Sequence, residues 1–110
     1  MKGMAILLVD DEPLIRLSMV DAFEGVGYDV HAVASGTEGL SVLREKSFDL
    51  VITDLRLPGA DGLTILKATK DRSPETEVVM ITAHGSVESA VGAMKLGAFD
   101  YITKPFQMDE

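Results

Sequence analysis

The sequence contains no cysteine, few aromatic residues and few basic ones. Without cysteine the protein has no disulfide, no thiolate zinc site and no thiol catalysis, which is compatible with a reducing cytosol. Its 110 residues include 10 Lys and Arg against 18 Asp and Glu, for a formal net charge of -8. Phosphate backbones and anionic lipid surfaces repel such a charge, so we expect no direct nucleic-acid binding.

Long hydrophobic runs are also missing. The apolar run at residues 5–9 is too short for a membrane span or the core of a signal peptide, so we expect a cytoplasmic protein that does not contact membranes. With 46% hydrophobic and 25% charged residues, the composition is that of one ordinary soluble domain, and no linker or repeat divides it. We therefore expect residues 1–110 to form a single domain.

Five short apolar runs have the length and composition of buried strands. We expect these strands at residues 5–9, 28–33, 48–54, 77–82 and 100–103, the second of them at or near a sheet edge. Helices are expected between them, starting at or just after Pro13, Ser35, Gly62 and Ser86, with Ser35 and Glu38 forming a capping box. This alternation predicts a right-handed, doubly wound α/β sheet of parallel strands, with the fifth helix largely missing.

Two of the expected helices have recognisable apolar positions. The first, from Leu14 to about Glu24, has its apolar pattern on Leu14, Leu17, Ser18 and Phe23. In the fourth we expect core packing by a stripe of Val87, Ala90, Val91 and Met94. Gly92 weakens that helix, since glycine costs up to about 1 kcal/mol relative to alanine, and we expect it to move readily.

Reactive side chains stand where the predicted strands end. In a doubly wound sheet these ends meet along one edge, whatever their separation in sequence. The ends carry Asp10 and Asp11, Asp54, Thr82 and Lys104. Each position also has a simpler explanation. Asp10 and Asp11 could cap a helix, Thr82 could be an ordinary strand residue, and Lys104 could be a solvated surface charge. These explanations do not account for the presence of all of them at the edge where such sheets bind ligands.

Three neighbouring carboxylates need a compensating cation to stay ionised. Lys104 supplies one positive charge, and a divalent ion would balance the rest; oxygen ligands favour Mg²⁺ over Zn²⁺. A carboxylate can also attack phosphorus to form an aspartyl phosphate, and Asp54 is the natural nucleophile. Thr82 and Lys104 would then meet the charge on the phosphoryl oxygens.

In these motifs the chain resembles the receiver domains of two-component response regulators. The resemblance covers residues 4–106 through Val9-Asp10-Asp11-Glu12-Pro13, Asp54 with Pro58-Gly59 and Gly62, Thr82-Ala83, and Lys104-Pro105-Phe106. It implies a flavodoxin-like sheet of order 2-1-3-4-5. Residues 80–88 and 97–101 are most similar to receivers that precede sigma-54-activating ATPase domains, so we expect an N-terminal fragment of a longer transcription regulator.

The resemblance also implies a role for each site residue. Asp54 would accept a phosphoryl group from a sensor histidine kinase, with Asp11, Asp54 and the backbone carbonyl of Arg56 as Mg²⁺ ligands and Asp10 acting through water. Thr82 and Tyr101 look like the switch pair, and Lys104 like the phosphate-binding lysine, before a Lys104-Pro105 bond that is typically cis in the family. Modulating positions would be Arg56, Ala83 and His84. Signals would pass through helix 4 and strand 5 to a C-terminal output domain or a second copy.

Other functions remain open at this point. A phosphohydrolase of the haloacid dehalogenase type would need a second Asp two positions after the nucleophile, where this chain has Arg56. In a flavodoxin-like flavin-binding module, the acidic residues 10–12 would repel the cofactor's phosphate. A pseudo-receiver would signal by protein contact alone. His84 could act as a general base, although a surface histidine that controls access of water is the simpler interpretation.

Overall fold

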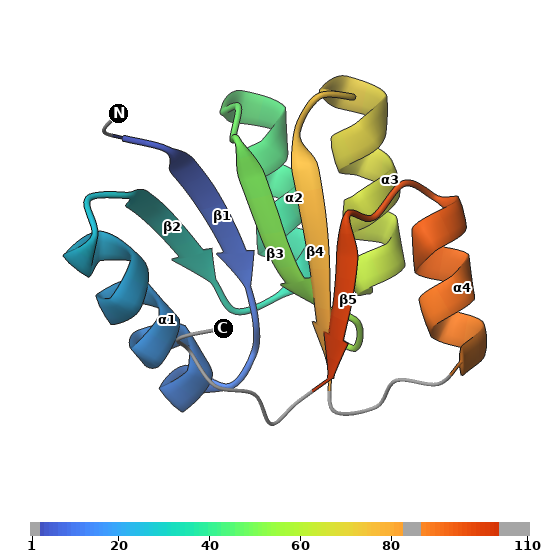
Figure 1. Cartoon of the computed structure of the whole chain (residues 1–110), viewed down its shortest axis with the longest axis horizontal. Coiled ribbons are helices and arrows are strands. Elements are labelled where there is room, and N and C mark those ends of the chain that lie inside the picture. The colour runs from blue at the N-terminus through green and yellow to red at the C-terminus, as the bar shows by residue number, and fades with distance from the viewer. Residues whose placement is uncertain (1–2, 83–86, 104–110) are drawn as a thin grey trace.

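Five parallel strands form one central sheet in the computed structural model, which describes residues 3–82 and 87–103 (Figure 1). Their order is β2-β1-β3-β4-β5, as the resemblance implied. The strands are β1 (Ala5–Val9), β2 (Asp29–Val33), β3 (Leu50–Asp54), β4 (Glu77–Thr82) and β5 (Asp100–Thr103). The predicted doubly wound α/β fold is confirmed.

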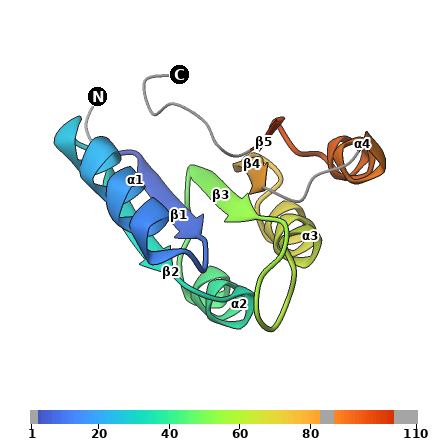
Figure 2. The same ribbon diagram turned by 90° about the horizontal axis from the view of Figure 1, so that it is seen from below.

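Helices cover both faces of the sheet. They are α1 (Pro13–Gly25), α2 (Gly36–Glu45), α3 (Gly62–Arg72) and α4 (Val87–Lys95). The larger apolar cluster joins the sheet to α2, α3 and α4, and the smaller one joins its other face to α1. Figure 2 shows α1 on the opposite side of the sheet from α2 and α3. Four helices accompany the five strands over the described residues, in agreement with the expectation that the fifth helix is largely missing.

The strands are buried according to their place in the sheet. In β1, residues 6–9 are fully buried, because the strand lies inside the sheet with helices on both faces. β2 lies at the edge and is only partly buried, as its alternating sequence predicted. Among the described residues, no helix is long and apolar enough to cross a bilayer.

The predicted apolar positions of α1 are wrong in part, although Phe23 does pack against the sheet. Leu14 and Leu17 are 77% and 63% exposed, whereas Met19 is buried. Ile15 and Phe23 pack beside Met19 in the smaller cluster, at the four-residue spacing of one helix face. The apolar positions at 14 and 17 lie off this stripe, so their hydrophobicity alone pointed to the wrong side of the helix.

The predicted core stripe of α4 is also wrong in part. Val91 and Met94 are 46% and 48% exposed, and Ala93 is the buried residue among the described side chains of the helix, at positions 88–95. α4 packs beside β5 at the edge of the sheet, where a small side chain allows close contact (Figure 1). The larger side chains of α4 therefore stay at the surface. Ser86, the predicted cap of this helix, lies outside the described residues, and the side chain of Val87 is not described.

Capping hydrogen bonds fix the residues at which α2 and α3 begin. Ser35 Oγ accepts from the Glu38 N–H at 3.1 Å, and Glu38 Oε1 accepts from the Ala34 N–H at 3.2 Å, which confirms the predicted capping box. Asp61, which was not predicted as a cap, accepts from the Thr64 N–H at 2.9 Å. Both helices consequently begin beside the sheet edge that carries the reactive residues.

Candidate functional site

Three of the predicted site residues lie at the carboxyl edge of neighbouring strands. Asp10 follows β1, Asp54 ends β3 and Thr82 ends β4, and the order β1-β3-β4 places these ends side by side. All three are buried, with exposures of 0%, 5% and 0%. Burial of polar and acidic side chains at strand ends distinguishes this edge from an ordinary solvated turn.

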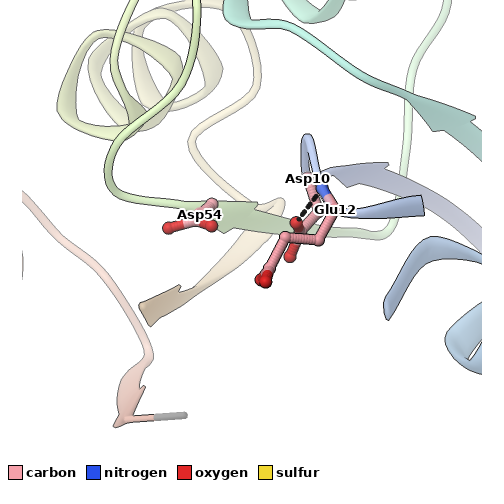
Figure 3. Close-up of side chains that lie close together, drawn as sticks. All are labelled: Asp10, Glu12 and Asp54. Atoms are coloured by element: carbon pink, nitrogen blue, oxygen red, sulfur yellow. Dashed lines mark hydrogen bonds between the residues drawn. The ribbon is translucent and has the colours of Figure 1, made fainter. Parts of the chain in front are cut away.

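Carboxylates from two strand ends gather at this edge. Asp10, Glu12 and Asp54 each offer one oxygen, and these oxygens lie within 4.8 Å of one another (Figure 3). The Glu12 N–H donates to Asp10 Oδ1 at 2.9 Å, which fixes the turn between them. Asp11, predicted as a direct metal ligand, is exposed and does not belong to this group. The donor set is entirely carboxylate oxygen, which fits a hard cation such as Mg²⁺.

Glu12 is a residue that the sequence analysis missed. It occupies the N-cap position of α1, but its side chain makes no capping hydrogen bond there. The carboxylate instead belongs to the group with Asp10 and Asp54. The only sequence signal was its place in the acidic run 10–12, which does not reveal how the turn directs each side chain.

Backbone and side-chain contacts orient the two aspartates. The Arg56 N–H lies 3.4 Å from Asp54 Oδ1, and Thr53 Oγ1 donates to the Asp54 carbonyl at 2.9 Å. The Arg16 guanidinium donates to the Asp10 carbonyl at 2.8 Å and so brings a positive charge beside the acidic turn. Arg16 was not predicted for the site. It lies in α1, and the sequence alone does not show that its side chain extends back to the Asp10 carbonyl. The side chain of Arg56 is exposed.

Thr82 and Tyr101 project from adjacent strands. Thr82 pairs with Thr103, and Tyr101 pairs with Met80, so residues 80, 82, 101 and 103 share one face by the two-residue period of a strand. Tyr101 is partly buried against the larger apolar cluster. Its hydroxyl lies 2.7 Å from Ser89 Oγ and so links β5 to α4.

Three predicted site residues, Lys104, Ala83 and His84, lie outside the described residues. The Lys104-Pro105 bond lies outside them as well. Their roles remain the ones that the resemblance implies.

The chain belongs to the response regulator receiver domain family, whose model matches residues 6–110. One solved structure similar to it is a CheY-like receiver domain from Methanospirillum hungatei JF-1, with a TM-score of 0.92 and 32% identity, covering 96% of this chain and 85% of that one. A second is a response regulator from Burkholderia pseudomallei with a phosphorylated aspartic acid, a calcium ion and citrate. It has a TM-score of 0.89 and 27% identity, covering 99% of this chain and 63% of that one.

Among proteins of known sequence, the chain is similar to the DNA-binding transcriptional regulator NtrC of Klebsiella pneumoniae. The two are 43% identical over 103 residues, which is 94% of this chain and 22% of that protein. The chain thus spans about a fifth of this relative's length. The predicted class, a receiver most like those preceding sigma-54-activating domains, is confirmed.

Proposed function

We propose that this receiver domain is a phosphorylation-activated switch that accepts a phosphoryl group on Asp54 from a partner histidine kinase. The observation that carries the proposal is the position of Asp54, 5% exposed at a strand end and grouped with Asp10 and Glu12. Such a carboxylate is held in place and faces a site where phosphorus can be attacked. The phosphorylated aspartic acid in the Burkholderia pseudomallei relative supports the same chemistry here.

The transfer follows from the chemistry of a carboxylate nucleophile. A side-chain oxygen of Asp54 forms a bond to phosphorus while the N–P bond of the kinase's phosphohistidine breaks. The electron pair of the broken bond stays on the imidazole nitrogen. The ring leaves as neutral imidazole when its other nitrogen carries a proton, and otherwise takes up a proton from water. Lys104 would pair with one phosphoryl oxygen, and the Thr82 hydroxyl would donate to another.

The acidic group would hold Mg²⁺. Asp54, Asp10 and Glu12 are the described carboxylates that lie together, and Asp11 and the Arg56 carbonyl are the further ligands that the resemblance implies. When bound, Mg²⁺ neutralises charge on the carboxylates and on the phosphoryl group. The chain's own acids would otherwise repel the incoming phosphate, so the reaction should require the ion.

The response to phosphorylation would pass through the switch pair. Thr82 would move toward the new anion, and Tyr101 would follow into the space that it leaves. Because the Tyr101 hydroxyl lies 2.7 Å from Ser89, that movement would change the contact between β5 and α4. To change the ratio of active to inactive conformation from 1:99 to 99:1, the phosphoryl group must stabilise the active conformation by about 5.5 kcal/mol more than the inactive one.

We further propose that the α4–β5 face binds a second copy or an output domain C-terminal to this chain. Several large apolar side chains are exposed on and next to α4 and β5, and they include Val91, Met94, Leu96, Phe99 and Ile102. Apolar side chains gathered in this way are typical of an interaction surface. The output would be control of transcription in the cytoplasm, and the net charge of -8 argues against DNA contact by this domain itself.

The rival functions are less well supported. Fast phosphohydrolysis would need an acid two positions after Asp54, and that position holds Arg56, whose side chain is exposed. We therefore propose a regulatory domain with only slow self-dephosphorylation. Flavin binding is opposed by the acidic turn at residues 10–12, and a pseudo-receiver would not need Asp54, Asp10 and Glu12 so close together.

Incubation with acetyl phosphate and Mg²⁺, followed by intact-mass measurement, tests the proposal. The wild-type chain should gain the mass of one phosphoryl group, and Asp54→Asn should gain none. EDTA should abolish the gain in the wild type. Equal labelling of Asp54→Asn would rule out Asp54 as the acceptor.

A further inference from the structure

The loop that follows Asp54 is packed against the start of α2. This β3–α3 loop, residues 55–61, carries the Arg56 backbone and leads into α3. In Figure 2 it extends alongside α2, on the same side of the sheet. The Gly36 N–H, at the first residue of α2, donates to the Pro58 carbonyl at 3.0 Å.

Two glycines make this close approach possible. A Cβ added to Gly36 would collide with the backbone carbonyl of Ala60, and rigid backbone cannot move aside as a flexible side chain can. A Cβ added to Gly59 would collide with Thr37 Oγ1, and Gly59 also has φ +81°, where other residues are strained. Gly36 therefore meets the loop through backbone atoms on both sides, and Gly59 meets the side chain of Thr37.

The other end of the loop is closed onto β3. The Gly62 N–H donates to the Leu55 carbonyl at 2.8 Å, and a Cβ on Gly62 would collide with the Asp54 carbonyl. Arg56 lies in the part of the loop between the contact with α2 at Pro58 and the contact with β3 at Leu55. Its N–H lies 3.4 Å from Asp54 Oδ1. A shift of the loop at Pro58–Ala60 would consequently displace the backbone next to the nucleophile.

We propose that the first residues of α2, Gly36 and Thr37, are positioning residues for the cation and phosphoryl site, acting through the β3–α3 loop. They touch neither the ion nor the phosphoryl group. Their effect is to set the place of the Arg56 backbone, on which both the Asp54 contact and the expected carbonyl ligand depend. Substituting residues that orient metal ligands typically costs 10- to 100-fold in metal affinity.

The experiment titrates MgCl2 into the ¹⁵N-labelled chain and follows amide chemical shifts, beside the rate of acetyl phosphate labelling by intact mass. Gly36→Ala should weaken Mg²⁺ binding by about 10-fold and slow labelling. Its control is Gly25→Ala, also helical, where an added Cβ meets nothing within 4 Å. The control should bind Mg²⁺ like the wild type.

A second pair of variants tests the inference even if Gly36→Ala does not fold. Gly59→Ala should also weaken Mg²⁺ binding, and its control is Gly27→Ala, with φ +96° and open space around it. Both substitutions strain a left-handed backbone, but only the first meets α2. Adding Thr37→Ala to Gly59→Ala removes the colliding hydroxyl but leaves the strained φ, so the double variant should bind Mg²⁺ more tightly than Gly59→Ala alone if the contact with α2 causes the loss.

The inference rests on the proposed function, and the two can fail separately. If the wild-type chain neither binds Mg²⁺ nor takes up phosphate, the proposed function fails. If the wild type does both, but Gly59→Ala binds Mg²⁺ as tightly as Gly27→Ala, the positioning role is wrong. Loss of affinity in the controls to the same extent would also overturn it.

Discussion

At the residue scale, the main feature is the cost of placing carboxylates together. Asp10, Glu12 and Asp54 present oxygens within 4.8 Å of one another, and Asp10 and Asp54 are buried. Two negative charges about 4 Å apart repel by about 1 kcal/mol in water and by several kcal/mol where water is partly excluded. This repulsion acts against the stability of the metal-free domain, and the proposed cation would relieve it.

This repulsion predicts that neutralising Asp54 stabilises the metal-free domain. We expect Asp54→Asn to raise the free energy of unfolding by about 1 kcal/mol in EDTA, because one charge leaves the acidic group. The gain should shrink as Mg²⁺ is added, since the ion stabilises the wild type more. Urea unfolding with and without Mg²⁺ measures both effects, and a variant less stable than the wild type in EDTA would contradict the prediction.

The same reasoning assigns part of the cation affinity to Glu12. Glu12→Gln removes one charge from the acidic group, and we expect Mg²⁺ binding to weaken about 5-fold, which corresponds to ~1 kcal/mol. Glu24→Gln is a suitable control, because Glu24 is an exposed acid at the far end of α1. Calorimetric titration would compare them, and equal affinities for the two variants would exclude Glu12 from the site.

At the element scale, α1 shows how a helix face is decided by its neighbours. Met19 is 4% exposed and packs with Ile15 and Phe23 against the sheet, while Leu17 is 63% exposed. Burial of apolar surface stabilises the domain only where the helix meets the sheet. The energetic importance of two hydrophobic residues on the same helix should therefore differ widely.

Alanine substitutions at these two positions test the observed face of α1. Met19→Ala should lower the free energy of unfolding by roughly 2–4 kcal/mol, since it leaves a cavity in the smaller cluster. Leu17→Ala should change it by no more than about 0.5 kcal/mol, as is usual for surface positions. Chemical unfolding of both variants decides the matter; a larger loss at Leu17 would mean that the helix packs by its other face.

Several elements could be predicted from the sequence because their signals are local. The five apolar runs, the Ser35–Glu38 capping box and the place of Asp54 at a strand end depend on neighbours in sequence or on the general rule for parallel sheets. The exposed Met94 and the place of the Glu12 carboxylate beside Asp10 and Asp54 could not be predicted in this way. Their positions depend on which element packs against α4 and on the geometry of one turn.

At the scale of the whole molecule, the sheet order brings distant segments to one edge. β3 lies between β1 and β4, so the ends that carry Asp10, Asp54 and Thr82 are neighbours, although Thr82 stands 72 positions after Asp10 in the sequence. β4 also pairs with β5, through Met80 and Tyr101. An event at Asp54 thus has a short structural path to the α4–β5 face.

The apolar α4–β5 face gives a prediction about association. Phosphorylation should strengthen self-association or binding of the output domain, and Met94→Asp should weaken it, because a charge would be buried at the contact. Val26→Asp is a control, since Val26 is 68% exposed at the end of α1, away from this face. Sedimentation velocity of the phosphorylated variants measures the effect, and equal loss at both positions would exclude a specific role for α4.

The central claim is that Asp54 itself becomes the aspartyl phosphate. Borohydride reduces an acyl phosphate to an alcohol, so reduction after treatment with acetyl phosphate and Mg²⁺ converts the modified aspartate to homoserine. Tandem mass spectrometry of the digested protein should find homoserine at position 54 and intact aspartate at positions 10 and 11. Homoserine at position 10 or 11, with position 54 unchanged, would contradict the account.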